Sequence, residues 1–183
     1  MQSDRIEKFH SRSDVVLLTP LGFTKDGDAV SIQSESLAAF TAGALDASKL
    51  VYISSNHHIL RGSTDENPNQ RIQMIQRSNV LQILDHYGLH MDSETGFPHW
   101  YNRNLGDDLD RDQRTMLLKL GWSVHALDRG VERAHIIDSE DGALLEELFT
   151  ARRGYGTCIS NDDYEAPHPE DTNDDLRVLT MDS

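Results

Sequence analysis

The residues best suited to chemistry in this sequence lie between positions 135 and 157, which read HIIDSEDGALLEELFTARRGYGT. The stretch contains His135, an acidic pair that includes Glu147, and the glycines Gly154 and Gly156. A carboxylate binds a guanidinium group in fork geometry, and glycine lets a ligand carboxylate approach backbone N–H groups closely. The same residues fit a purely structural interpretation, with a core histidine, a solvated acidic helix face and a glycine turn. Residue types alone favour that structural interpretation.

Metal and hydrolase chemistry have weaker support. The chain has nine histidines, and His86 and His90 have the spacing that places two imidazoles on one helix face. No glutamate stands between them in the metalloprotease pattern, and no third ligand follows from the spacing. The G-x-S-x-G motif of serine hydrolases does not occur in the sequence. We therefore expect no metal ion and no cofactor in this chain.

Strands and helices must position these residues, and the apolar pattern predicts both. Apolar runs typical of buried strands occupy residues 14–19 and 50–55, and further strands are predicted over 132–138 and 156–160. A turn at Lys25-Asp26-Gly27 predicts a hairpin after the first run. Strand, helix, strand order implies right-handed crossovers and a mostly parallel sheet, which is an α/β fold.

Helical periodicity appears in four places along the chain. Helices are predicted from Ser34, as N-cap, to about Asp46, within residues 72–87, over 113–127 with Gly130 ending it, and around Leu144, Leu145, Leu148 and Phe149 with Asp141 or Ser139 as cap. The rest of residues 57–112 is polar and reads as loop, and residues 161–183 form an acidic tail with little to pack.

Composition excludes several classes of function. With 17 basic and 31 acidic residues the net charge is −14, which repels nucleic acid and anionic lipid. Cys158 is the only cysteine, so no intrachain disulfide is available. No apolar run is long enough to span a membrane. These features predict a soluble, cytoplasmic protein that binds neither nucleic acid nor membrane, with an organelle as the open alternative.

Two segments resemble the amino-acid-kinase domain that acetylglutamate kinases share with N-acetylglutamate synthases. The first, GVERAHIIDSEDGALLEELFTARRGYGTCIS over residues 130–160, is similar to the C-terminal strand, LL-ELF helix and G-GT loop of that domain. The second, residues 15–55, is similar to its preceding strand, hairpin, helix and strand. The resemblance covers under half of the chain and implies the C-terminal part of that fold, spanning residues 1–160. Residues 57–112 would be a polar insertion, and the acidic tail 161–183 a linker to a missing acetyltransferase domain.

Departures from the kinase pattern favour the synthase over the kinase. Ser31 and Glu35 stand where kinases of the family have asparagine and aspartate, and Ser55 stands where they have the aspartate of a Thr-Asp pair. Lys119 matches the kinase lysine, but the glycine and proline before it are absent. The resemblance therefore implies a degenerate phosphoryl-transfer site formed by Ser31, Glu35, Ser55 and Lys119.

The synthase resemblance also implies a regulatory site and a set of partners. His135, Glu147, Gly154 and Gly156 match residues that bind the inhibitor L-arginine in the family, with Glu146 as a rival to Glu147. The parent enzyme would transfer acetyl from acetyl-CoA to L-glutamate in the first step of arginine biosynthesis. The chain would be its arginine-sensing part, inactive alone, without catalytic residues, and a homo-oligomer. The alternatives are a stand-alone arginine-binding regulator and an acetylglutamate kinase.

Overall fold

A computed structural model describes residues 6, 8, 15–54, 61–62, 70–101, 109–139, 143–149 and 156–163. Its central element is a four-stranded sheet with the order β3-β9-β10-β6. These strands are β3 (Lys49–Ser54), β9 (Arg133–Asp138), β10 (Thr157–Ser160) and β6 (Met74–Gln76). The helices are α2 (Ser34–Ala44), α3 (Arg77–His86), α5 (Arg111–Leu127) and α6 (Ala143–Phe149).

The sheet is mostly parallel, as the sequence predicts. β3 runs parallel to β9, and β10 runs parallel to β6. Only the β9–β10 pair is antiparallel, and its register places Cys158 opposite His135. The α/β fold class is confirmed, and the predicted strands over 50–55, 132–138 and 156–160 are present within a residue or two of their expected bounds.

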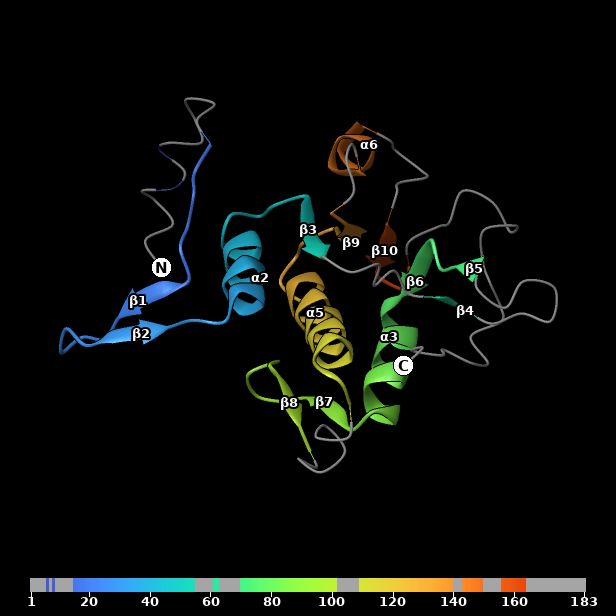
Figure 1. The fold of residues 1–183 in the computed structure, drawn as a ribbon, viewed down its shortest axis with the longest axis horizontal. Coiled ribbons are helices and arrows are strands. Elements are labelled where there is room, and N and C mark those ends of the chain that lie inside the picture. The colour runs from blue at the N-terminus through green and yellow to red at the C-terminus, as the bar shows by residue number, and fades with distance from the viewer. Residues whose placement is uncertain are drawn as a thin grey trace.

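The helices cover the two faces of the sheet unequally (Figure 1). α2, α5 and α3 lie side by side on one face, and α6 lies on the other. Because side chains alternate between the two faces of a sheet, consecutive residues of β9 pack on opposite faces. Ala134 and Ile136 join the main core, whereas His135 points to the α6 side, where it contacts Glu147.

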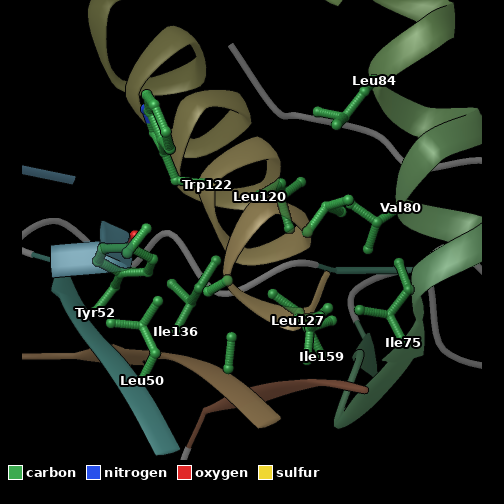
Figure 2. Packing of buried hydrophobic residues seen from close by; sticks show 14 of the residues in the cluster. Leu50, Tyr52, Ile75, Val80, Leu84, Leu120, Trp122, Leu127, Ile136 and Ile159 are labelled. Carbon is green, nitrogen blue, oxygen red and sulfur yellow. The ribbon is translucent and has the colours of Figure 1, made fainter. Parts of the chain in front are cut away.

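The main hydrophobic core fills the space between the sheet and helices α5 and α3 (Figure 2). Leu50 and Ile136 extend from the strands, Leu120 and Leu127 from α5, and Val80 from α3. α5 has the longest run of buried residues because it packs against the sheet, α2 and α3 at once. Asp110 and Gln113 form a capping box at its start, and the backbone of Gly130 adopts a positive φ of 94° just after its end.

Residues 15–19 do not form the predicted buried strand. The hairpin that follows them is present, as β1 (Leu21–Phe23) and β2 (Ala29–Ser31), and Gly27 takes a positive φ of 92° in its turn. Figure 1 shows this hairpin projecting from α2, well away from the sheet. The side chains of Val15 and Leu17 are 98% and 89% exposed. An apolar run becomes a buried strand only when neighbours cover it, and no described residue does so here.

The central region, residues 57–112, contains more strands than the sequence predicts. Its helix is present as α3, but β6 belongs to the main sheet, and β7 (Leu89–Met91) pairs with β8 (Pro98–Trp100) in an antiparallel hairpin. Short ladders also join β4 (Arg61–Gly62) to β5 (Gln70–Arg71). The expectation of loop outside the helix is therefore wrong, because strands of two or three residues carry almost no periodic signal.

The β7–β8 hairpin packs against α5 through a glycine. A Cβ atom on Gly121 would lie 2.6 Å from Cβ of Pro98, so the close approach requires glycine. Phe97 also contacts Phe40 and Trp122, which ties the hairpin to α2 and α5.

The start of α2 differs from the prediction by one residue. Gln33, not Ser34, is the N-cap, and its side chain makes no capping hydrogen bond. The Gln33 side chain instead accepts a hydrogen bond from Nε1 of Trp122 at 3.3 Å. A contact with α5 thus replaces the local cap.

Candidate functional site

His135, Glu147 and Gly156 meet on the face of the sheet that α6 covers. His135 lies in β9, Glu147 in α6, and Gly156 immediately before β10. Both side chains are buried, with exposed fractions of 5% for His135 and 2% for Glu147. The structure therefore brings together three of the four residues assigned to arginine binding, although they come from separate elements.

Glu147 is the centre of this group, and both of its carboxylate oxygens have partners. Oε1 contacts Nδ1 of His135, and Oε2 accepts a hydrogen bond from the backbone N–H of Gly156 at 3.1 Å. The backbone carbonyl of Glu147 accepts a further hydrogen bond from Nζ of Lys49 at 3.3 Å. A single residue of α6 thus connects β3, β9 and the start of β10. We name His135, Glu147 and Gly156 the carboxylate cluster.

Gly156 is required at its position for steric reasons. A Cβ atom there would lie 2.2 Å from the backbone oxygen of Ile136 and 2.5 Å from Cγ2 of Ile137. Because a backbone oxygen in a sheet cannot move aside, any larger residue would push the chain away from β9. The absent side chain lets the Gly156 N–H reach Glu147.

Lys49 and Cys158 border the cluster, and the sequence interpretation missed both. Sγ of Cys158 lies 3.9 Å from Nε2 of His135, within range of a weak sulfur hydrogen bond. Burial raises the pKa of the Cys158 thiol to about 11, and Glu147 adds to the rise, while Arg133 and Lys49 oppose it. Only the register that pairs Cys158 with His135 reveals this proximity, because the two residues are distant in sequence.

Two of the sequence assignments fall outside the described residues. Gly154 lies in a segment that the structure does not describe, and the same holds for the side chain of Glu146. Glu147 is the acidic residue that meets His135 and Gly156. The choice between Glu146 and Glu147 stays a prediction, because the side chain of Glu146 lies outside the described residues.

The residues of the degenerate phosphoryl-transfer site also come together in part. Nζ of Lys119 donates a hydrogen bond to Oγ of Ser54 at 3.1 Å, at the end of β3. Lys119 is only 7% exposed, and burial lowers its pKa, although the negative charges of Glu35 and Asp112 act to raise that pKa. Ser31 lies exposed in β2, and Ser55 falls outside the described residues.

Tyr52 fixes the first turn of α2 beside Lys119. Its hydroxyl donates a hydrogen bond to the backbone oxygen of Glu35 at 2.9 Å. Burial raises the pKa of Tyr52 far above its ordinary range, and Glu35 adds to this effect. The tyrosine therefore remains a neutral donor that holds the start of α2 against β3.

The histidines of the central region do not gather into a common site within the described residues. Nδ1 of His90 lies 3.5 Å from Oδ1 of Asp85, and the ring of His86 packs edge-on against Tyr87. Among the residues that the structure describes, no three histidine, cysteine, aspartate or glutamate side chains are arranged to hold a metal ion. No helix in the described ranges is both long and apolar enough to cross a membrane.

Curated proteins with similar sequences carry two kinds of name. The chain is 30% identical over 166 residues to the amino-acid acetyltransferase of Ralstonia nicotianae, covering 90% of this chain and 30% of that protein. It is 25% identical over 160 residues to the acetylglutamate kinase of Methanobrevibacter smithii, covering 87% of this chain and 46% of that protein. The chain thus spans less than half the length of these relatives.

Solved structures show the same fold. An N-acetylglutamate synthase from Neisseria gonorrhoeae, in complex with coenzyme A and N-acetyl-glutamate, has a TM-score of 0.64 and 23% identity, covering 90% of this chain and 32% of that one. The synthase from the same organism, in complex with coenzyme A and L-arginine, has a TM-score of 0.63 and 23% identity, with coverages of 88% and 31%.

A family model gives the most direct assignment. The model of the amino acid kinase family matches residues 1–138, which is most of the chain. The mostly parallel α/β sheet described above is in accord with that match. The chain belongs to the amino acid kinase family.

Proposed function

We propose that this chain is the kinase-like, arginine-sensing part of an N-acetylglutamate synthase. The observation that carries the proposal is the carboxylate cluster, in which a buried glutamate is held beside a histidine and a glycine N–H. The relatives named amino-acid acetyltransferase and the synthase solved with L-arginine support it. Gly154 remains a sequence-based member of the site.

The chemistry of the cluster suits an amino acid with a guanidinium group. The Glu147 carboxylate would accept paired N–H bonds from the planar guanidinium, which an ammonium group cannot match in geometry. The N–H of Gly156 and the surroundings of His135 would orient the ligand. The chain itself would bind L-arginine and perform no covalent step.

Catalysis would belong to the whole protein, beyond the described residues. There the amino nitrogen of L-glutamate would attack the thioester carbon of acetyl-CoA, and CoA would leave as the thiol. A homo-oligomer in the cytoplasm is the assembly we propose, with arginine binding as the inhibitory signal. In the chain described here, buried Lys119 next to Ser54 would serve packing rather than phosphoryl transfer.

Calorimetric titration with L-arginine tests the sensing role. We expect wild-type protein to bind arginine, and Glu147→Gln to lose the binding while remaining folded. L-citrulline, which has a neutral group in place of the guanidinium, should not bind. Glu132→Gln, which changes an exposed glutamate outside the cluster, is the matched control and should bind like wild type. Equal affinities for arginine and citrulline, or an unaffected Glu147→Gln variant, would refute the site.

Acetylglutamate kinase is the second candidate function, because Lys119 and Glu35 lie close enough to interact at the start of α2. It predicts ATP-dependent phosphorylation of N-acetyl-L-glutamate that Lys119→Met abolishes. We expect no such activity, because Ser31 and Ser55 replace the residues that kinases use.

The third possibility, a stand-alone arginine-binding regulator, shares the arginine site but predicts that the full-length protein forms no acetylglutamate.

A further inference from the structure

The tip of the β7–β8 hairpin, residues 92–97, is joined to α5 by a hydrogen bond from a histidine. Nδ1 of His125 donates to the backbone oxygen of Gly96 at 2.8 Å. Gly96 has a positive φ of 68°, and a Cβ there would lie 3.2 Å from Nδ1 of His125. The tip is closed on itself, because Oδ1 of Asp92 accepts hydrogen bonds from the N–H and the hydroxyl of Thr95 at 2.7 Å. The hairpin tip thus presents one carbonyl group to the histidine.

The other ring nitrogen of His125 faces apolar groups. Nε2 is buried and has no hydrogen-bond partner among the described residues. The rings of Phe40, Phe97 and Trp122 surround the imidazole at centroid distances of 5.0 to 5.4 Å, and they come from α2, the hairpin tip and α5. The neutral ring, with its proton on Nδ1, fits this site. A second proton on Nε2 would be a buried donor without an acceptor and would add a charge among apolar groups, which costs free energy.

The charges at the end of α5 do not offset that cost. Burial is the largest influence on His125 and lowers its pKa, while Arg129 and Asp128 act on it with opposite signs. The guanidinium of Arg129 also lies over the ring of Phe40, 5.3 Å from its centroid. A protonated His125 would therefore bring a second positive charge to the same aromatic ring.

The hairpin and α2 supply no acceptor for Nε2 within the described part of the chain. The carboxylate of Asp92 accepts the hydrogen bonds of its own turn, which lower its pKa, and Glu94 beside it is exposed. His90 and His99 lie opposite each other on the two strands, and His99 is exposed. The ionisable side chain of α2 is that of Glu35, in its first turn.

The hairpin tip can move while the main sheet stays intact. Among the described strands, β7 and β8 pair with each other and not with the main sheet. Leu89, at the base of β7, is fully buried in the main core and fixes the base of the hairpin. The tip is attached through the carbonyl of Gly96 and the ring of Phe97. Local opening of such a segment costs less free energy than unfolding of the whole domain.

We propose that the hairpin tip is a pH-sensitive latch, which a second proton on His125 releases from α2 and α5 while the main core stays folded. Above the ordinary histidine pKa of about 6.5 the ring is neutral and the latch is closed. As the pH falls from there toward the lower pKa of the closed form, the open form binds the proton more tightly and gains population. The latch lies apart from the carboxylate cluster and does not depend on arginine binding.

Release of the latch would also reach the start of α2. Nε1 of Trp122 donates a hydrogen bond at 3.3 Å to the side chain of Gln33, the N-cap of α2. Because Phe97 of the hairpin tip packs on Trp122 and Phe40, its departure exposes both rings to water. Acidification would thus loosen the contact between α5 and the first turn of α2.

The accessibility of Trp122 to acrylamide measures the opening. Trp100→Phe leaves Trp122 as the only tryptophan of the chain, and Trp122 is 5% exposed in the closed form. We expect its quenching constant to rise as the pH is lowered from about 7.5 to 5, because one linked proton raises the open-to-closed ratio by up to about tenfold per pH unit. The far-UV circular dichroism should stay unchanged over this range.

His125→Gln, made in the same Trp100→Phe protein, tests the role of the histidine, since its amide can donate to Gly96 but does not titrate. Quenching of Trp122 should then be independent of pH. His99→Gln, which removes an exposed histidine of β8, is the matched control and should respond to pH like the parent. A pH-independent quenching constant in the parent, or an equal response in His125→Gln, would overturn the proposal. So would a loss of circular dichroism in step with the quenching, because the opening would then be global unfolding.

Nuclear magnetic resonance of the wild-type protein gives a second readout that does not depend on how well His125→Gln folds. The ring signals of His125 should titrate with the same midpoint as the quenching of Trp122. Midpoints that differ by more than about one pH unit would contradict the latch, because another group would then control the opening. Failure of the latch would leave the arginine titration unaffected, since the two sites share no residue.

Discussion

At the scale of single residues, the carboxylate cluster depends on the absence of one side chain. Gly156 lets β10 approach β9 so closely that its N–H reaches Glu147, and the sheet backbone fills the space that a methyl group would need. A glycine is usually required for its conformational freedom, but Gly156 is required because the neighbouring strand lies too close for any side chain.

Gly156→Ala should therefore destabilise the protein by about 1–3 kcal/mol, because the new methyl group overlaps the backbone of Ile136. It should also weaken arginine binding by moving the N–H away from Glu147. Urea denaturation measures the first effect and calorimetry the second. The control is Gly43→Ala on α2, where the nearest atom to a Cβ would be Cβ of Arg129 at 3.0 Å and not a backbone oxygen. We expect Gly43→Ala to change the free energy of unfolding by no more than about 1 kcal/mol. An equal loss of stability in both variants would contradict the steric argument.

At the scale of elements, the β7–β8 hairpin is attached to α5 by a buried histidine among aromatic rings. Nδ1 of His125 donates a hydrogen bond to the backbone oxygen of Gly96 at 2.8 Å, so the neutral ring carries its proton there. Its Nε2 is buried without a hydrogen-bond partner in the described part of the chain. The rings of Phe40, Phe97 and Trp122 surround it at centroid distances of 5.0 to 5.4 Å.

This arrangement predicts that stability falls on acidification. Burial lowers the pKa of His125, with Arg129 adding to the effect, while the bond to Gly96 and the charge of Asp128 oppose it. The unfolded chain then takes up the proton at a higher pH than the folded chain. The stability that neutral His125 contributes is present above the ordinary histidine pKa of about 6.5 and is lost as the pH falls from there toward the lower folded value.

Urea denaturation between about pH 5 and 8 measures the effect, with His125→Gln as the comparison. The free energy of unfolding of the variant should depend less on pH over this range than that of the wild-type protein. Fluorescence of Trp122, which packs on His125, should report the same transition. Identical pH dependence in the two proteins would show that His125 contributes nothing to it.

At the scale of the whole molecule, apolar surface lies exposed along the N-terminal arm, which we define as residues 15–23. Its exposed apolar side chains include Val15, Leu17, Leu21 and Phe23. β3 is an edge strand of the main sheet among the described residues, and Ile53 on it is 52% exposed. Exposed apolar chain and open sheet edges are both places where copies of a protein associate.

Replacing Leu17 by Gln and Phe23 by Thr should reduce self-association of the chain, as measured by light scattering across a concentration series. The free energy of unfolding should change by no more than about 0.5 kcal/mol, because neither side chain belongs to the core. Leu117→Ala, at a fully buried position, should instead destabilise by about 2–5 kcal/mol. Unchanged association in the double variant would show that the arm is not the surface involved.

Several of these features follow from local sequence. The capping box of Asp110 and Gln113, the long apolar stripe of α5 and the turn at Gly27 each depend on residues a few positions apart. Pattern and propensity predicted the apolar stripe and the turn, whereas the capping box was not predicted, because the helix was expected to begin only at Gln113. Resemblance to a family added His135, Glu147 and Gly156, which periodicity alone assigned to ordinary packing.

Other features were decided only by tertiary contacts. The apolar run at residues 15–19 has strand character in sequence, yet it forms no strand because no described neighbour covers it. β6, of three residues, is a strand because β10 lies beside it. The sequence by itself determined the α/β class, the main helices and the residue types available for binding a guanidinium. Only the sheet register placed Cys158 against His135, and only the packing of α6 on the sheet brought Glu147 to His135, because the partners of a buried charge come from elements that meet after folding.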